Sequence, residues 1–139
     1  MTTSESYPFL NIENAWGEFI LRPLLPLSLY LHDSSVSVNG LLDTGADVNI
    51  LPYDVGLQIG AIWSECPILP SPTGNLSKYE TRGLAVTATI GNLPPVQLGF
   101  AWVQSDHVPF LLGQINFFMQ FDVCFFRASS RFEIRPKSR

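Results

Sequence analysis

Residues 41–47, Leu-Leu-Asp-Thr-Gly-Ala-Asp, constrain this chain more than any other stretch, because they put a carboxylic acid on a tight turn directly after an apolar run. A second apolar, strand-like run follows at residues 48–51. Gly45 allows the positive φ or close backbone approach that a tight acidic turn needs, and its amide can hydrogen-bond the carboxylate. An ordinary turn is the alternative interpretation of the tripeptide alone, since Asp, Thr and Gly all suit turns. The stretch therefore predicts two strands joined by a turn that displays Asp43.

Length and composition predict one globular domain that buries part of its surface against a partner. The chain has 139 residues, of which 46% are hydrophobic and 14% charged, a balance that argues against disorder. So large an apolar share also indicates that some surface is covered by a partner. The net charge of −4 argues against general nucleic-acid binding.

The two ends of the chain differ in charge. Five of the eight basic residues lie in the last thirteen positions, and we interpret residues 135–139 as a solvated basic tail. The N-terminus is polar and acidic, unlike the basic start of a signal peptide. The most apolar segment, residues 20–31, is interrupted by an arginine and two prolines, so no membrane span is expected. A cytoplasmic protein is the expectation.

The cysteines and histidines of this chain do not have the spacing of a metal site. Cys66 and Cys124 lack metal-ligand spacing; a single disulfide is one interpretation, and two buried thiols in a reducing compartment is the preferred one. His32 and His107 are interpreted as surface or strand residues rather than as ligands. No metal and no cofactor are therefore expected.

The apolar pattern predicts a β domain over residues 22–134, preceded by an N-terminal arm, mobile or regulatory, over residues 1–21. Leu27, Leu29 and Leu31 alternate with polar residues, which is typical of a half-buried strand. Many short strands with frequent turns favour a small all-β barrel or sandwich. Further strands are expected at 36–42, 48–51, 84–90, 96–103 and 132–134, turns at 33–35 and 91–95, a bulge or local turn at 39–40, a loop or hairpin tip at 67–77, and short helices at 54–62 and 114–120.

Two further motifs accompany the acidic turn. Residues 110–113, Phe-Leu-Leu-Gly, place three large apolar residues and a glycine before the second expected helix, and residues 22–24, Arg-Pro-Leu, precede the first strands. Together with residues 43–45 they resemble the retropepsins, the aspartic proteases of retroviruses, and their single-domain bacterial relatives. The resemblance implies an all-β acid-protease half-barrel with one short C-terminal helix, completed as a symmetric homodimer.

The chemistry of such proteases explains why a homodimer is expected. Hydrolysis without a metal or a covalent intermediate needs a base to activate water and an acid to protonate the carbonyl oxygen. Two neighbouring carboxyls that share one proton supply both roles, as aspartic proteases exemplify. The second half of this chain contains no second Asp-Thr-Gly or Asp-Ser-Gly. A two-fold axis that brings Asp43 to its own copy would complete the pair.

The resemblance also assigns roles to individual residues. In the family the arginine of the Arg-Pro-Leu start pairs with an aspartate of the partner's catalytic loop, which here is Asp47. Gln114 stands where retroviral enzymes have arginine, and the flap expected at residues 68–77 has one glycine and two prolines instead of a glycine-rich tip. The expected site comprises catalytic Asp43, Thr44 and Gly45, substrate-binding Ala46, Asp47, Thr73, Gly74 and Leu111, and dimer or support residues Arg22, Leu112, Gly113 and Gln114.

Three functions compete on this basis. The first is an aspartic endopeptidase that cleaves extended, hydrophobic peptide segments. The second is a catalytically weak or inactive dimerisation or peptide-binding module, similar to the retropepsin-like domains of ubiquitin-shuttle proteins and favoured by the flap and Gln114. The third is a protease inhibited by its N-terminal arm and trimmed between residues 1 and 22. Residues 132–134 are expected to join an intersubunit sheet, and five phenylalanines to fill the core with a share in the dimer interface: Phe117, Phe118, Phe121, Phe125 and Phe126.

Overall fold

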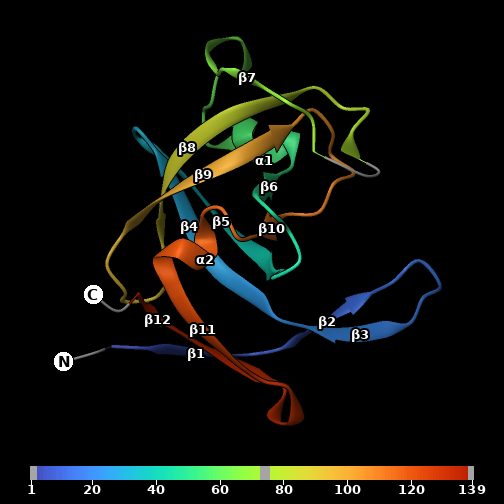
Figure 1. The fold of residues 1–139 in the computed structure, drawn as a ribbon, viewed down its shortest axis with the longest axis vertical. Coiled ribbons are helices and arrows are strands. Elements are labelled where there is room, and N and C mark those ends of the chain that lie inside the picture. Colours follow the sequence, from blue (N-terminus) through green and yellow to red (C-terminus); the bar gives the residue numbers. More distant parts are fainter. Residues whose placement is uncertain (1–2, 73–75, 138–139) are drawn as a thin grey trace.

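The computed structural model describes residues 3–72 and 76–137 and is mostly β, as the sequence predicts (Figure 1). The helices are short, namely α1 (Tyr53–Gln58), α2 (Phe117–Gln120) and the 3-10 turns η1 (Trp63–Glu65) and η3 (Arg127–Ser129). The strands are β1 (Glu5–Pro8), β2 (Leu10–Glu13), β3 (Phe19–Arg22), β4 (Leu24–Leu31), β5 (Ser34–Leu42), β6 (Asn49–Leu51), β7 (Ile68–Leu69), β8 (Thr81–Thr89), β9 (Val96–Val103), β10 (Leu111–Leu112), β11 (Phe121–Phe126) and β12 (Arg131–Pro136).

The largest sheet closes into a barrel. Its strands follow the order β4-β5-β10-β6-β9-β8, and pairing of β4 with β8 joins the two ends, while β7 extends beyond β8. On β4, Leu27 and Leu29 are buried and Leu31 packs partly buried against the core, so the predicted alternation is confirmed. The turn between the end of β5 and the start of β6 lies outside these strands, where it can present polar groups.

An aromatic cluster joins α1 to the wall of the barrel. Trp102 of β9 is fully buried, stacks on Tyr53 and meets Trp63 edge to face. The Trp102 indole N–H donates to the Tyr53 carbonyl oxygen at 3.0 Å. Gly56 faces this ring, and a Cβ on Gly56 would lie 2.2 Å from the indole. The absence of a side chain therefore lets the helix lie directly on the tryptophan.

The β4–β5 hairpin corrects two local expectations. Its turn lies at residues 32–33, earlier than predicted, with His32 at φ 53°. Residues 39–40 form no bulge, because β4 and β5 pair without interruption from Leu24↔Leu41 to Leu31↔Ser34. No larger residue fits at Gly40 without a shift of its neighbours, because a Cβ would lie 2.8 Å from the side chains of Phe110 and Leu112. This glycine allows the residues of β10 to pack against β5.

Both predicted helices exist but are shorter than expected. The first ends at Gln58 because Gly60 adopts φ 83°, which turns the chain. The second begins at Phe117 instead of residue 114, because the amides of Gln114 and Ile115 donate to the Ala46 and Asp47 carbonyls. None of the helices within the described residues is long and apolar enough to cross a membrane.

The terminal segments are strands. The arm expected over residues 1–21 pairs β1 with β12, and β2 with β3, the latter as a hairpin that projects away from the barrel (Figure 1). The tail expected at residues 135–139 begins inside β12, which ends at Pro136. The terminal sheet has the order β1-β12-β11, so both edges of β12 are paired within the chain. Within the described residues, β1 and β11 are the edge strands of this sheet, so a second copy could extend it only beside one of these two strands and not beside residues 132–134 directly.

Both cysteines are free thiols, as the preferred interpretation has it, but both are half-buried instead of buried. Burial raises the pKa of the Cys66 thiol, and nearby Glu65 raises it further, whereas Arg82 opposes both. Cys124 is half-buried on β11, with its sulfur 3.8 Å from the Arg135 guanidinium. No disulfide therefore constrains the fold.

Replacement of Gly56 by alanine tests the packing of α1. Alanine normally stabilises a helix relative to glycine by about 1 kcal/mol. Here the added methyl meets the Trp102 ring, so we expect the free energy of unfolding to fall by about 1–3 kcal/mol. The control is Gly99→Ala on β9, where a Cβ meets nothing within 4 Å and stability should stay level or rise by up to about 1 kcal/mol. Urea unfolding of both variants measures the difference, and equal stability would contradict the packing argument.

Candidate active site

Asp43 lies at the point where β5 leaves the barrel. β10 runs parallel to β5, pairing Leu111 with Leu41 and Leu112 with Leu42, and it pairs antiparallel with β6 on its other side. The Asp43 amide donates to the Leu112 carbonyl at 3.0 Å, and the Leu42 amide donates to Pro23 at 3.1 Å. The backbone at Asp43 and directly before it is therefore held by β10 and by Pro23, which lies between β3 and β4.

The turn after Asp43 closes on its own carboxylate. The Gly45 amide donates to Asp43 Oδ1 at 2.9 Å, as the sequence predicts, and the Ala46 amide donates to the Asp43 carbonyl at 3.1 Å. Gly45 does not have a positive φ. It instead provides the close approach, because a Cβ there would lie 3.3 Å from Asp43 Oδ1. The half-buried carboxylate is thus oriented by a backbone donor.

Residues 113–115 pass directly beneath this turn. A Cβ on Gly113 would lie 2.6 Å from the carbonyl oxygens of both Ala46 and Val48, so no larger residue fits without moving the backbone. The Gln114 side-chain amide donates to the Thr44 carbonyl at 2.8 Å, and the Gln114 backbone amide donates to the Ala46 carbonyl at 2.9 Å. Gln114 therefore fastens the acidic turn by neutral hydrogen bonds.

A buried amide that we did not predict supports the same turn. Asn49 is fully buried, and its Oδ1 accepts the Gly113 amide at 2.8 Å. Its Nδ2 donates to the Gly99 carbonyl at 2.9 Å and to Asn116 Oδ1 at 3.1 Å. Asn49 thereby joins the segment beneath the turn to β9. The signal was present in the sequence as a single amide inside an apolar strand, since a buried amide needs partners.

A cleft of about 440 Å³ opens beside the turn. Predicted site residues Ala46, Asp47 and Leu111 line it together with Gly45, whereas Asp43 and Thr44 do not. Residues 69–72 and Leu76, from the segment where the flap was expected, also line it. Thr73 and Gly74, the expected flap-tip residues, lie outside the described residues. Arg22 is exposed at the end of β3 and does not line the cleft.

An apolar depression of about 470 Å³ adjoins this cleft. The two share Val48, Leu69 and Ala101 in their linings. The lining of the second includes small residues on neighbouring strands, Gly83 and Ala85 of β8 and Gly99 of β9. Two adjacent apolar hollows separated by a few residues can hold successive side chains of an extended chain.

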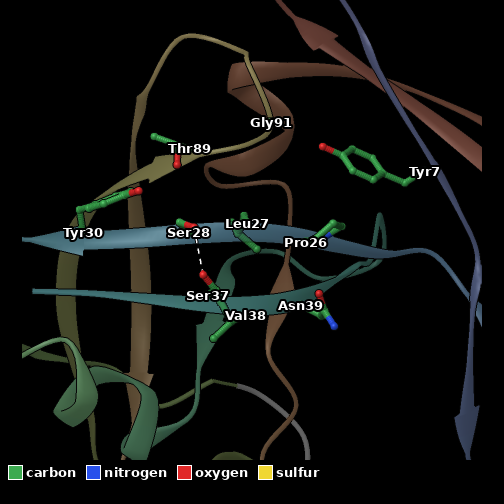
Figure 2. A pocket seen from close by; sticks show the side chains of 10 residues that line it. All are labelled: Tyr7, Pro26, Leu27, Ser28, Tyr30, Ser37, Val38, Asn39, Thr89 and Gly91. Carbon is green, nitrogen blue, oxygen red and sulfur yellow. Dashed lines mark hydrogen bonds between the residues drawn. The ribbon is translucent and has the colours of Figure 1, made fainter.

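A third cavity, of about 600 Å³, is separate from the acidic turn (Figure 2). Its lining is neutral and rich in hydroxyls, with Ser28 and Ser37 linked at 3.3 Å and with Tyr7, Tyr30 and Thr89 also in the lining. Burial raises the pKa of Tyr7, and the Glu5 carboxylate adds to the effect. None of the predicted site residues lines this cavity, so we assign the candidate site to the cleft beside residues 45–47.

The titratable side chains do not form a metal site in the described part of the chain. Within residues 3–72 and 76–137, no three or more His, Cys, Asp or Glu side chains gather as they would around a metal ion. The candidate site therefore consists of the acidic turn, the amides that support it and the cleft beside it.

Comparison with known proteins identifies the fold. No family model and no curated protein sequence matches this chain. A retropepsin-like aspartic protease from Rickettsia conorii superposes with a TM-score of 0.63 at 13% identity, over 98% of this chain and 96% of that one. EIAV protease, solved with the inhibitor HBY-793, gives a TM-score of 0.53 at 19% identity, over 74% of this chain and 88% of that one. The predicted resemblance is thus confirmed as a likeness of fold: this is a retropepsin-like fold over nearly the whole chain.

Replacement of Asn49 tests the support of the acidic turn. Asn49→Ala leaves the buried Gly113 amide and the Gly99 carbonyl without this partner, so the free energy of unfolding should fall by about 2–3 kcal/mol. The control is Asn39→Ala on the exposed face of β5, which should change it by no more than about 0.5 kcal/mol. Thermal or urea unfolding compares the two. Equally small losses would show that the amide network does not hold this part of the fold.

Proposed function

We propose that this protein is an aspartic endopeptidase in which the Asp43 carboxyls of two copies activate one water molecule. The observation that carries the proposal is the acidic turn itself. Its carboxylate accepts the Gly45 amide, its backbone is fixed to β10, and a cleft opens beside it in a retropepsin-like fold. Such a turn presents a carboxyl group in a fixed orientation, which acid–base catalysis requires.

The need for two copies follows from the chemistry of one carboxyl. One Asp43 takes a proton from water, which attacks the peptide carbonyl carbon, while its protonated mate donates a proton to the carbonyl oxygen. Collapse of the tetrahedral intermediate returns a proton to the leaving amine and breaks the C–N bond. Neighbouring carboxyls hold a single shared proton because both cannot readily ionise, and the pair titrates as a unit. A two-fold axis beside Asp43 places it outside the cleft of either chain alone, which agrees with its absence from the lining.

The cleft supports an extended peptide with hydrophobic side chains as the substrate. Its walls combine the acidic turn with Leu69 and Leu76 on the flap side, and the neighbouring depression is apolar. Because the side chains of an extended peptide alternate, successive residues can occupy separate hollows. Asp47 is exposed at the cleft, where its carboxylate can accept an amide of the substrate backbone. We further propose that Arg22 pairs with the partner's Asp47 across the dimer.

A catalytically weak, peptide-binding dimer is the second candidate. Two features favour it: Gln114 fastens the turn through neutral hydrogen bonds where retroviral enzymes use arginine, and the flap carries Pro70 and Pro72. Proline fixes its own φ, so this flap closes over a peptide with less freedom than a glycine-rich one. Both candidates need the cleft and the dimer, and catalysis separates them.

Replacement of Asp43 by asparagine tests the catalytic role. The amide preserves the shape but cannot exchange protons, so peptide cleavage should fall by about 10²–10⁴-fold. Asp33→Asn, in the β4–β5 turn, is the control and should keep wild-type activity. Cleavage of casein or a peptide library between about pH 3 and 7 is the measurement.

The outcomes distinguish the candidates. Activity that survives Asp43→Asn would exclude the aspartic mechanism. A stable dimer without activity in either protein, but with saturable binding of extended apolar peptides, would favour the peptide-binding module.

A further inference from the structure

We propose that the β2–β3 hairpin is an intersubunit arm, and that the two arms of a dimer lie antiparallel across its two-fold axis. The arm is residues 10–22, and its tip is residues 13–19. Each tip would contact the turn between β11 and β12 of the other copy, residues 125–131, named here the basic turn. The inference rests on the homodimer of the proposed function and adds to it the surface by which the copies recognise one another.

The arm exposes large apolar side chains. Trp16 is 84% exposed and Phe19 69% exposed, while Leu10 at the other end is 38% exposed. The two strands of the arm pair only with one another and project away from the barrel (Figure 1). A two-stranded ribbon is marginally stable by itself, and exposed aromatic clusters mark interaction surfaces. The arm therefore has the character of a contact surface.

The tip is nevertheless well ordered by its own hydrogen bonds. The Asn14 side-chain oxygen accepts the Trp16 amide at 2.9 Å and the Glu18 amide at 3.0 Å. The Gly17 amide donates to the Asn14 carbonyl at 3.1 Å, with Gly17 at φ 77°. Trp16 is thus presented on a preformed turn, which reduces the entropy lost when it binds.

Charge indicates which surface the tip contacts. Glu13 and Glu18 are exposed at the tip, and no lysine or arginine occurs between residues 11 and 21. The basic turn carries exposed Arg127 and Arg131, and the Arg131 guanidinium lies 4.1 Å from the Phe126 ring centroid. An acidic, aromatic tip and a basic, aromatic turn are complementary in both charge and apolar character.

Within one chain these two surfaces are held apart. The Phe9 amide donates to the Ser130 carbonyl at 2.7 Å, and Arg127 lies 5.7 Å from the Phe9 ring centroid, so the basic turn sits at the root of the arm. The tip begins four residues further along, about 13 Å away for an extended strand. An arm that is acidic at its tip and basic at its root is self-complementary under a two-fold axis, because each tip meets the other root.

The root of the arm also adjoins the candidate active site. β3 ends at Arg22, and the next residue, Pro23, accepts the Leu42 amide directly before Asp43. The face that contains Asp43 needs a second copy to complete the catalytic pair. The same copy is therefore in reach of the arm, which favours a second chain over an unrelated protein as the occupant.

Two charge-reversed variants test the arrangement. Glu13→Lys with Glu18→Lys gives a chain that is basic at both tip and turn, and Arg127→Glu with Arg131→Glu gives one that is acidic at both. Each should dimerise at least tenfold more weakly than the wild type in sedimentation at low salt, where screening is small. A 1:1 mixture should recover the wild-type affinity, because both contacts of the heterodimer join opposite charges. Asp33→Lys with Glu65→Lys is the control for net charge and should dimerise as the wild type does.

Tryptophan fluorescence gives an independent readout. Trp102 is buried and Trp63 half-buried, so Trp16 dominates the solvent-exposed emission. Emission should shift to shorter wavelength as the wild type dimerises, and Trp16→Phe should abolish the shift. The arm would be overturned if the wild type dimerises, none of the variants changes its affinity and Trp16 emission stays constant. The proposed function would then still stand.

Two further results separate the arm from the proposed function. A chain that stays monomeric at high concentration would overturn both. If the variants dimerise as predicted but no peptide cleavage depends on Asp43, the catalytic proposal is overturned and the arm is supported.

Discussion

The insertion of β10 between β5 and β6 is the constraint on which the rest of the structure depends. The Leu112 carbonyl of β10 accepts a hydrogen bond from the Asp43 amide, and the residues that follow β10 pass beneath the acidic turn. The fit has no spare room, because a Cβ on Gly113 would touch two carbonyl oxygens and a Cβ on Gly40 would touch Phe110 and Leu112. Two glycines and one buried amide, Asn49, therefore hold the turn that carries the Asp43 carboxyl in a fixed place.

Under the proposed function, the same constraint explains why catalysis would need a second copy of the chain. A rigid turn orients one carboxyl, but it cannot supply the second, and the sequence contains no second acidic motif of this kind. Symmetry is the physical means by which one motif becomes two. Under this account the exposed aromatic residues of the β2–β3 arm and the uneven charge of the chain contribute to association instead of to the core.

The parts of the fold that follow local pattern were predictable from the sequence. Alternation identified β4 and β8, and the acidic turn with residues 110–113 indicated the fold. The terminal sheet was not predictable in this way, because β1 is held by a partner distant in sequence, as in the pairing of Glu5 with Ile134. The late start of α2 and the role of Asn49 likewise depend on contacts with the acidic turn and with β9, which no local pattern encodes.

The most direct measurement of the central claim mixes wild-type protein with an excess of the Asp43→Asn chain. If catalysis needs one Asp43 from each copy, mixed dimers are inactive. A ninefold excess should then lower the cleavage rate per wild-type chain by about tenfold once the subunits have exchanged. A rate per wild-type chain that is unchanged by the excess would contradict the account, because it would show that one chain carries a complete active site.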